Sequence, residues 1–177
     1  ARNFEESGNL TQAIASYKKA LQLDGRNYVI MTSLSGALIK TGAYAESVQY
    51  SRFALNTNRN YVPAMINLAI ASIQLGNLTE GEQNLLRARS LEPANKSVLF
   101  NLALLYENQK KYQDAYGVYE KIAAANNGQG FTGMGRVLEK QGKRDEAKKL
   151  YRGILSSNTA DAATKQYANE RLIALGN

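Results

Sequence analysis

Hydrophobic positions along the chain recur with helical spacing and are interrupted at regular intervals by glycine turns. The stretch from Val62 to Asn95 shows the unit, because two apolar-periodic segments flank a turn at Gly76. Apolar residues three and four apart predict amphipathic helices, and the glycine between them predicts a helix-turn-helix hairpin. Gly8, Gly42 and Gly76 lie 34 apart in the sequence, and Gly142 follows 66 after Gly76. The pattern therefore predicts an all-α chain built from repeats.

The 34-residue period divides the chain into helix pairs that form one array. We expect a partial repeat over about 1–27, repeats over 28–61, 62–95, 96–127 and 128–161, and a capping helix over 162–175. Lys110 takes the place of the turn glycine in the fourth repeat, which also ends two residues early. Because Ala1 falls in the middle of a helical pattern, we expect the chain to be a piece of a longer protein.

Threonines after two of the turns are predicted to begin the second helices of their repeats. Thr11 is expected to cap one helix. Thr79 and Glu82 are expected to form a capping box, in which hydroxyl and carboxylate each bind a free amide of the first turn.

A period of about 34 residues with two helices per repeat is the signature of the tetratricopeptide repeat. The turn glycines resemble that family over essentially the whole chain, as do three small-then-aromatic pairs: Ala13 with Tyr17, Ala115 with Tyr119, and Ala147 with Tyr151. Lys110 departs from the pattern, as does Ser51, where an aromatic residue is usual. The resemblance implies a right-handed α-solenoid of about five helix pairs, whose first helices line a concave groove. It also implies a non-catalytic scaffold that binds proteins.

Composition narrows the chemistry further. The 177 residues include no cysteine and no histidine, which removes the thiol nucleophile, the commonest general base and the commonest metal ligand. No clustered carboxylate pair suggests an active site, so we expect no enzyme activity, no metal and no cofactor. Residues 128–133, GQGFTG, match a dinucleotide-binding motif, but a helical segment precedes them instead of a strand. We expect a flexible hinge there. No apolar run approaches the roughly 20 residues that span a bilayer.

The first helix of the third repeat carries more apolar residues than one packing stripe needs. Four of its residues account for the packing: Met65, Leu68, Ala69 and Ser72. Ile66 and Ile70 are left over and are predicted to face the groove, with Phe100 and Leu104 at the matching places one repeat later. Ile73 and Glu107 continue these two stripes. If exposed together, the four apolar side chains would form a patch that marks a binding surface; the alternative is that neighbouring helices cover them.

Asn67 and Asn101 lie one full period apart and occupy equivalent places in adjacent repeats. An amide side chain offers one acceptor and two donors, which suits the backbone of an extended peptide. Peptide-binding members of the resembled family often carry asparagine in this column, so the resemblance supports the role. Because asparagine is abundant in the chain, coincidence is the alternative.

Positive charge is concentrated in the fifth repeat of a chain with a formal net charge of +7. Arg136, Lys140 and Lys143 form one stripe, and the first two are predicted to orient an acidic flank of a bound peptide. The alternative is a solvated helix face with ion pairs four residues apart. Nucleic acid is not a predicted partner, because the basic residues are not interleaved with exposed aromatic ones.

The resemblance also bears on one particular class of client. Family members that bind chaperones hold a C-terminal carboxylate with lysines and an arginine in fixed groove columns. The matching lysine column reads Thr32, Ile66, Phe100 and Thr132 in this chain. We therefore do not expect binding to acidic chaperone tails.

These patterns together predict an adaptor that holds an extended or helical segment of a partner protein in its groove. The alternative function is a structural scaffold that self-associates into a homo-oligomer.

Overall fold

The computed structural model describes residues 1, 4, 8–125 and 128–176. Within this part the chain has ten helices and no strand, so the all-α prediction is confirmed. The helices are α2 (Leu10–Leu23), α3 (Tyr28–Lys40), α4 (Tyr44–Thr57), α5 (Val62–Gln74), α6 (Leu78–Leu91), α7 (Lys96–Asn108), α8 (Tyr112–Ala124), α9 (Gly128–Lys140), α10 (Arg144–Ser156) and α11 (Ala162–Ala174). The helical pattern expected before Gly8 lies mostly outside the described residues.

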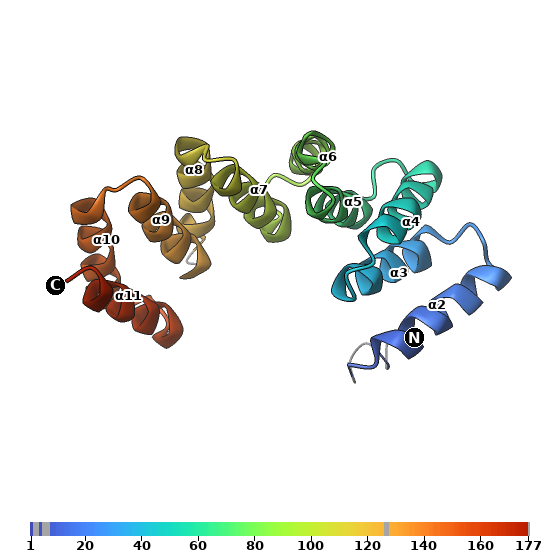
Figure 1. The fold of residues 1–177 in the computed structure, drawn as a ribbon, viewed down its shortest axis with the longest axis horizontal. Helices are drawn as coiled ribbons and strands as arrows, with labels where there is room; N and C mark the ends of the chain where they lie inside the picture. The colour runs from blue at the N-terminus through green and yellow to red at the C-terminus, as the bar shows by residue number, and fades with distance from the viewer. Residues whose placement is uncertain (2–3, 5–7, 126–127, 177) are drawn as a thin grey trace. The chain divides into compact units, whose positions relative to one another are not determined.

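The helices belong to two compact units, residues 1–98 and 99–177, with the boundary inside α7. In the first unit, each helix from α2 to α5 packs on the next one, and α3 also contacts α5 (Figure 1). In the second unit, α9 contacts both α8 and α10, and α11 packs on α9 and α10. Contacts between successive helices and between alternate ones characterise a helical-repeat solenoid. The predicted fold class is confirmed.

The turn between the two helices of a pair needs one residue with a positive φ. Gly42, Gly76 and Gly142 provide it with φ values of 77°, 83° and 75°. Lys110 adopts the same conformation with φ 59°, although a side chain there costs roughly 1–2 kcal/mol. The fourth repeat therefore keeps the turn geometry without the glycine.

The helix caps differ from the threonine caps that the sequence suggested. Asn9, not Thr11, caps α2 by accepting a hydrogen bond from the Gln12 amide at 3.2 Å. Asn77 caps α6 by accepting one from the Glu80 amide at 3.3 Å. The predicted capping box of Thr79 and Glu82 is wrong for the same reason, because the asparagine directly after Gly8 and Gly76 already holds the cap position in these two helices.

The glycine-rich stretch at residues 128–133 is the beginning of α9, so the predicted hinge is also wrong. A Cβ on Gly133 would lie closer than 3.0 Å to the ring of Tyr119, and one on Gly130 closer than 3.0 Å to the backbone of Ala123. Both glycines are buried. They are needed because α9 approaches α8 too closely for a side chain.

Ser51, which replaces the usual aromatic residue, belongs to a buried hydroxyl network. The Ser35 hydroxyl lies 2.8 Å from that of Ser47 and 2.7 Å from that of Ser51. All three side chains are fully buried. The second repeat therefore fills this part of its core with small hydrogen-bonded residues, which satisfy one another.

Candidate functional site

In the first unit, the candidate residues lie on α5, beside a fully packed stripe. Met65 is completely buried and Leu68 is 4% exposed. Ile66, Asn67 and Ile70 are only half-buried. The fold of this unit therefore leaves part of the surface of both isoleucines accessible.

The Asn67 side chain is held in a defined orientation. Its Nδ2 donates a hydrogen bond of 2.9 Å to the backbone carbonyl of Thr32 on α3. This bond connects the first helices of two successive repeats. It uses one of the two N–H groups of the amide.

In the second unit, the matching residues lie on α7. Phe100, Asn101 and Leu104 are half-buried, whereas Leu102 and Ala103 are completely buried. The two sets of residues thus show the same exposure pattern in their own units. That they line one continuous groove stays a prediction from the repeat spacing.

The last residues of the two predicted stripes have other contacts. A Cβ built on Gly81 would lie closer than 3.0 Å to Ile73, so Ile73 packs against α6. Glu107 is buried, with 4% exposure. The side chains of both residues are therefore engaged within their own units.

Glu107 is the centre of a charged cluster. Arg136 binds its carboxylate with two hydrogen bonds, Nε to Oε1 at 2.7 Å and a terminal NH2 to Oε2 at 2.9 Å. The Lys140 ammonium lies 2.8 Å from Oε1. The Tyr119 hydroxyl donates to Oε2 at 3.0 Å and accepts from Arg136 at 2.7 Å. The two cations predicted to meet a peptide flank thus already share one internal carboxylate.

The electrostatics of the cluster follow from these contacts. Burial alone would raise the pKa of the Glu107 carboxyl, but the hydrogen bonds from Arg136 and Lys140 outweigh it and lower the pKa to about 2. Burial raises the pKa of the Tyr119 hydroxyl, which stays neutral at physiological pH. With two cations on one carboxylate, the cluster keeps an excess of one positive charge.

The same cluster recurs one repeat further along the chain. The Tyr151 hydroxyl donates to Glu139 at 2.6 Å, and Arg171 of α11 binds both oxygens of that carboxylate. Sequence reasoning missed both clusters. The signal was present, because the spacing from Glu107 to Tyr119 equals the spacing from Glu139 to Tyr151.

A cavity of about 410 Å³ lies between these clusters in the second unit. Its lining residues are Arg136, Glu139, Lys140, Tyr167 and Arg171. Arg136, Lys140 and Arg171 face this cavity. The carboxylates of Glu139 and Glu107 offset two of these three positive charges, so one positive charge remains in excess. A cavity of this size and sign can accept one acidic side chain.

The described part of the chain shows no group of three or more residues able to hold a metal ion. None of its helices is both long and apolar enough to cross a membrane.

A solenoid of helix pairs, with partly exposed apolar and amide side chains on its first helices, defines a helical-repeat scaffold. Models of the tetratricopeptide repeat match residues 1–27, 66–129 and 131–158, and the chain belongs to the tetratricopeptide repeat family. Proteins of this family are generally non-catalytic protein-interaction modules.

Among characterised proteins, the chain is similar to RNA polymerase II-associated protein 3 of Xenopus laevis, with 25% identity over 121 residues. The match covers 68% of this chain but only 18% of that protein. The chain therefore spans about a fifth of its relative's length.

Two solved structures show the same fold. The crystal structure of MamA superimposes with a TM-score of 0.76 and 20% identity, covering 97% of this chain and 95% of MamA. The first tetratricopeptide domain of Spaghetti (RPAP3), bound to the HSP90 peptide SRMEEVD, superimposes with a TM-score of 0.59 and 24% identity. That match covers 61% of this chain and 86% of the other.

Proposed function

We propose that the chain is a non-catalytic adaptor that binds an extended or helical segment of a partner protein in the groove formed by its first helices. The observation that carries this proposal is the exposure pattern of α5. The packing stripe of this helix is buried, whereas Ile66 and Ile70 keep part of their apolar surface accessible beside an oriented amide, Asn67. Accessible apolar side chains around polar groups are typical of binding surfaces.

Each proposed contact has a separate role. Ile66 and Ile70, with Phe100 and Leu104 on α7, would anchor apolar side chains of the partner. Asn67, fixed through the Thr32 carbonyl, would offer its second N–H and its oxygen to the partner's backbone. Asn101 would do the same one repeat later.

The second unit would bind an acidic flank of the partner. Arg136 and Lys140 keep one positive charge in excess over Glu107, which supports this role. A bound carboxylate would lie in the cavity of about 410 Å³ that both residues line. The acidic residue of the partner would share these cations with Glu107, whose single negative charge leaves one positive charge in excess.

A client capture tests the proposal. Wild-type protein is compared with the double variant Asn67→Ala/Asn101→Ala, and cross-linked partners are identified by mass spectrometry. The matched control is Asn56→Ala/Asn108→Ala, which removes two exposed asparagines of α4 and α7. Because Asn67 donates to Thr32, we expect the test variant to lose about 0.5–1.5 kcal/mol of stability. Capture is therefore done where circular dichroism shows all three proteins folded.

The expected result is that the test variant loses partners that the wild type and the control both retain. Equal capture by all three would rule out the asparagines as contacts. Capture of further copies of the chain alone would replace the adaptor by a self-associating scaffold.

A further inference from the structure

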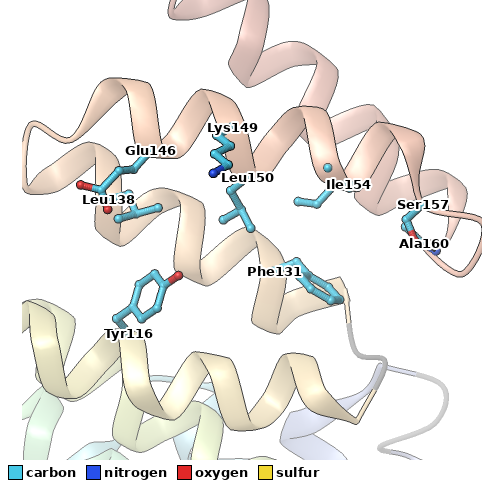
Figure 2. Close-up of a pocket in the computed structure, with 10 residues that line it drawn as sticks. Tyr116, Phe131, Leu138, Glu146, Lys149, Leu150, Ile154, Ser157 and Ala160 are labelled. Atoms are coloured by element: carbon cyan, nitrogen blue, oxygen red, sulfur yellow. Dashed lines mark hydrogen bonds between the residues drawn. The ribbon is translucent and has the colours of Figure 1, made fainter.

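The second unit contains a further cavity of about 600 Å³, between α8, α9 and α10 (Figure 2). Tyr116, Phe131 and Leu150 point into it, one from each of these helices. Among the described residues, the charged ones that line it are Glu146 and Lys149, whose formal charges cancel. Neither its apolar walls nor its charge therefore selects a particular occupant. The groove face of the first unit differs, because it carries a polar side chain whose direction is fixed.

That side chain, the amide of Asn67, lies directly beside Gly36 of α3. Its Nδ2 donates to the Thr32 carbonyl at 2.9 Å. In an α-helix the same carbonyl also accepts the backbone N–H of residue 36, four positions later. A Cβ built on Gly36 would lie 3.5 Å from Nδ2 of Asn67, and this nitrogen is the only atom of another described helix within 4 Å. A side chain at position 36 would therefore lie on the Asn67 amide.

Packing does not require the glycine at position 36. A separation of 3.5 Å is ordinary van der Waals contact, so an alanine would fit between α3 and α5. A glycine inside a helix is also less stable than an alanine. Gly117 of α8 shares both properties, so a glycine alone marks no site. Gly36 is distinguished by its neighbour, because its missing side chain leaves the half-buried amide of Asn67 accessible.

The remaining hydrogen-bonding groups of Asn67 select the conformation of a partner. One N–H of the amide binds the Thr32 carbonyl, and the other N–H and the oxygen have no hydrogen-bond partner among the described residues. A donor and an acceptor side by side match the C=O and N–H groups of a peptide main chain. Inside a helical segment those groups are bonded to one another, whereas in an extended segment they are free to bind. An extended segment therefore fits this amide.

We propose that Gly36 and Asn67 together form a contact point for the main chain of an extended peptide, which passes over Gly36. The inference rests on the proposed function and decides between its two kinds of partner, an extended and a helical segment. Ile66 and Ile70 lie beside Asn67 on α5 and contact neighbouring side chains of the peptide. The glycine at position 36 is thus a specificity-determining residue, because any side chain there separates the peptide main chain from the amide.

The test begins with a selection of phage-displayed random peptides on the intact chain, followed by fluorescence anisotropy with the enriched peptides. Gly36→Leu covers the Asn67 amide, and Gly36→Ala adds the smallest side chain. The matched controls are Gly117→Leu and Gly117→Ala, since Gly117 is also half-buried inside a helix and a Cβ on it would meet nothing within 4 Å. Asn67→Ala tests the amide itself.

Stability and binding should change in opposite directions. Gly36→Ala and Gly117→Ala should each raise the midpoint of thermal unfolding by about 1–4 °C, because alanine is the better helix former. Gly36→Leu should weaken peptide binding about tenfold or more, and Gly36→Ala should weaken it less. The two Gly117 variants should leave the affinity unchanged. Weaker binding by a more stable protein does not come from unfolding.

Modified peptides test the extended conformation. Esters replace the amides of an enriched peptide one at a time, and each removes one main-chain N–H. At one position the ester should weaken binding to the wild type but not to Asn67→Ala. A lactam bridge that fixes the same peptide as a helix should abolish binding. Tighter binding of the bridged peptide would show a helical partner and overturn the inference.

Failure of this inference can be told from failure of the proposed function. If Asn67→Ala weakens binding and Gly36→Leu does not, the main chain does not pass over Gly36, and the inference is overturned while the adaptor function stands. If neither substitution changes the affinity, or if no peptide is enriched, the surface of α5 is not the binding site and both proposals fail.

Discussion

Arg136 and Glu107 form a bidentate ion pair that joins α9 to α7, with hydrogen bonds of 2.7 and 2.9 Å. Arg171 and Glu139 repeat this arrangement between α11 and α9. In both cases a carboxylate near the end of one first helix binds an arginine from the following repeat or cap. Consecutive repeats of the second unit are thus linked by charge as well as by apolar packing.

Removal of the Glu107 charge should destabilise the second unit. Glu107→Gln keeps the shape but leaves Arg136 and Lys140 without their anion. We expect the free energy of unfolding at pH 7 to fall by about 1–3 kcal/mol. This is less than for a fully buried charged pair, because the Arg136 side chain is 35% exposed and solvent screens its charge. Urea titration measures the change. Glu120→Gln, at an exposed position of α8, is the control and should leave stability nearly unchanged.

The same variant should show a distinctive dependence on pH. The pKa of Glu107 in the folded state is lowered from its ordinary 4.5 to about 2. A lowered pKa means that the carboxylate stabilises the fold above about pH 4.5 and loses this effect as the pH falls towards 2. The stability difference between wild type and Glu107→Gln should therefore shrink over that interval. A difference that stays constant from pH 7 to below about pH 3 would contradict an ionised Glu107.

Two helix glycines should respond in opposite ways to the same substitution. A Cβ on Gly135 would lie closer than 3.0 Å to the ring of Tyr151, which is fully buried. Gly135→Ala should therefore lower stability by about 1–3 kcal/mol through overpacking. Gly117 has open space, so Gly117→Ala should raise stability by about 0.5–1 kcal/mol. Thermal melts of the two variants decide this, and equal shifts would exclude a close approach of α9 to Tyr151.

The turn at Lys110 offers a route to stabilisation. Lys110→Gly should relieve the left-handed conformation and raise the free energy of unfolding by about 0.5–1 kcal/mol, after the greater entropy of glycine in the unfolded chain is deducted. Gly76→Ala imposes the opposite change at φ 83° and should destabilise by about 1 kcal/mol. Chemical denaturation tests both. A neutral Lys110→Gly would mean that the lysine side chain contributes compensating contacts.

The peptide SRMEEVD, which is bound to the first tetratricopeptide domain of Spaghetti (RPAP3), provides a negative test of specificity. We expect no saturable binding of this peptide to the present chain, because the column that holds lysines in chaperone-binding relatives reads Thr32, Ile66, Phe100 and Thr132. Fluorescence anisotropy with the labelled peptide measures this. Tight binding that is abolished by amidation of the peptide's C-terminus would show that other residues form a carboxylate clamp.

The repeat architecture could be predicted from the sequence because it rests on local and periodic signals. Gly42, Gly76 and Gly142 mark turns that need a positive φ, and apolar residues at helical spacing mark the faces that pack. The position of Lys110 in the turn was also evident from spacing alone. These signals act over one or two helical turns and recur in each repeat, so one chain displays them several times.

The tertiary structure alone decided which polar groups meet. Arg136 lies 29 residues from Glu107 and Asn67 lies 35 from Thr32, so neither contact follows from spacing within a helix. It also decided that the glycines of residues 128–133 begin a helix, because their role depends on the ring of Tyr119 and the backbone of Ala123 on a neighbouring helix. Local sequence determines where helices and turns lie, but side-chain partners depend on how closely separate helices approach.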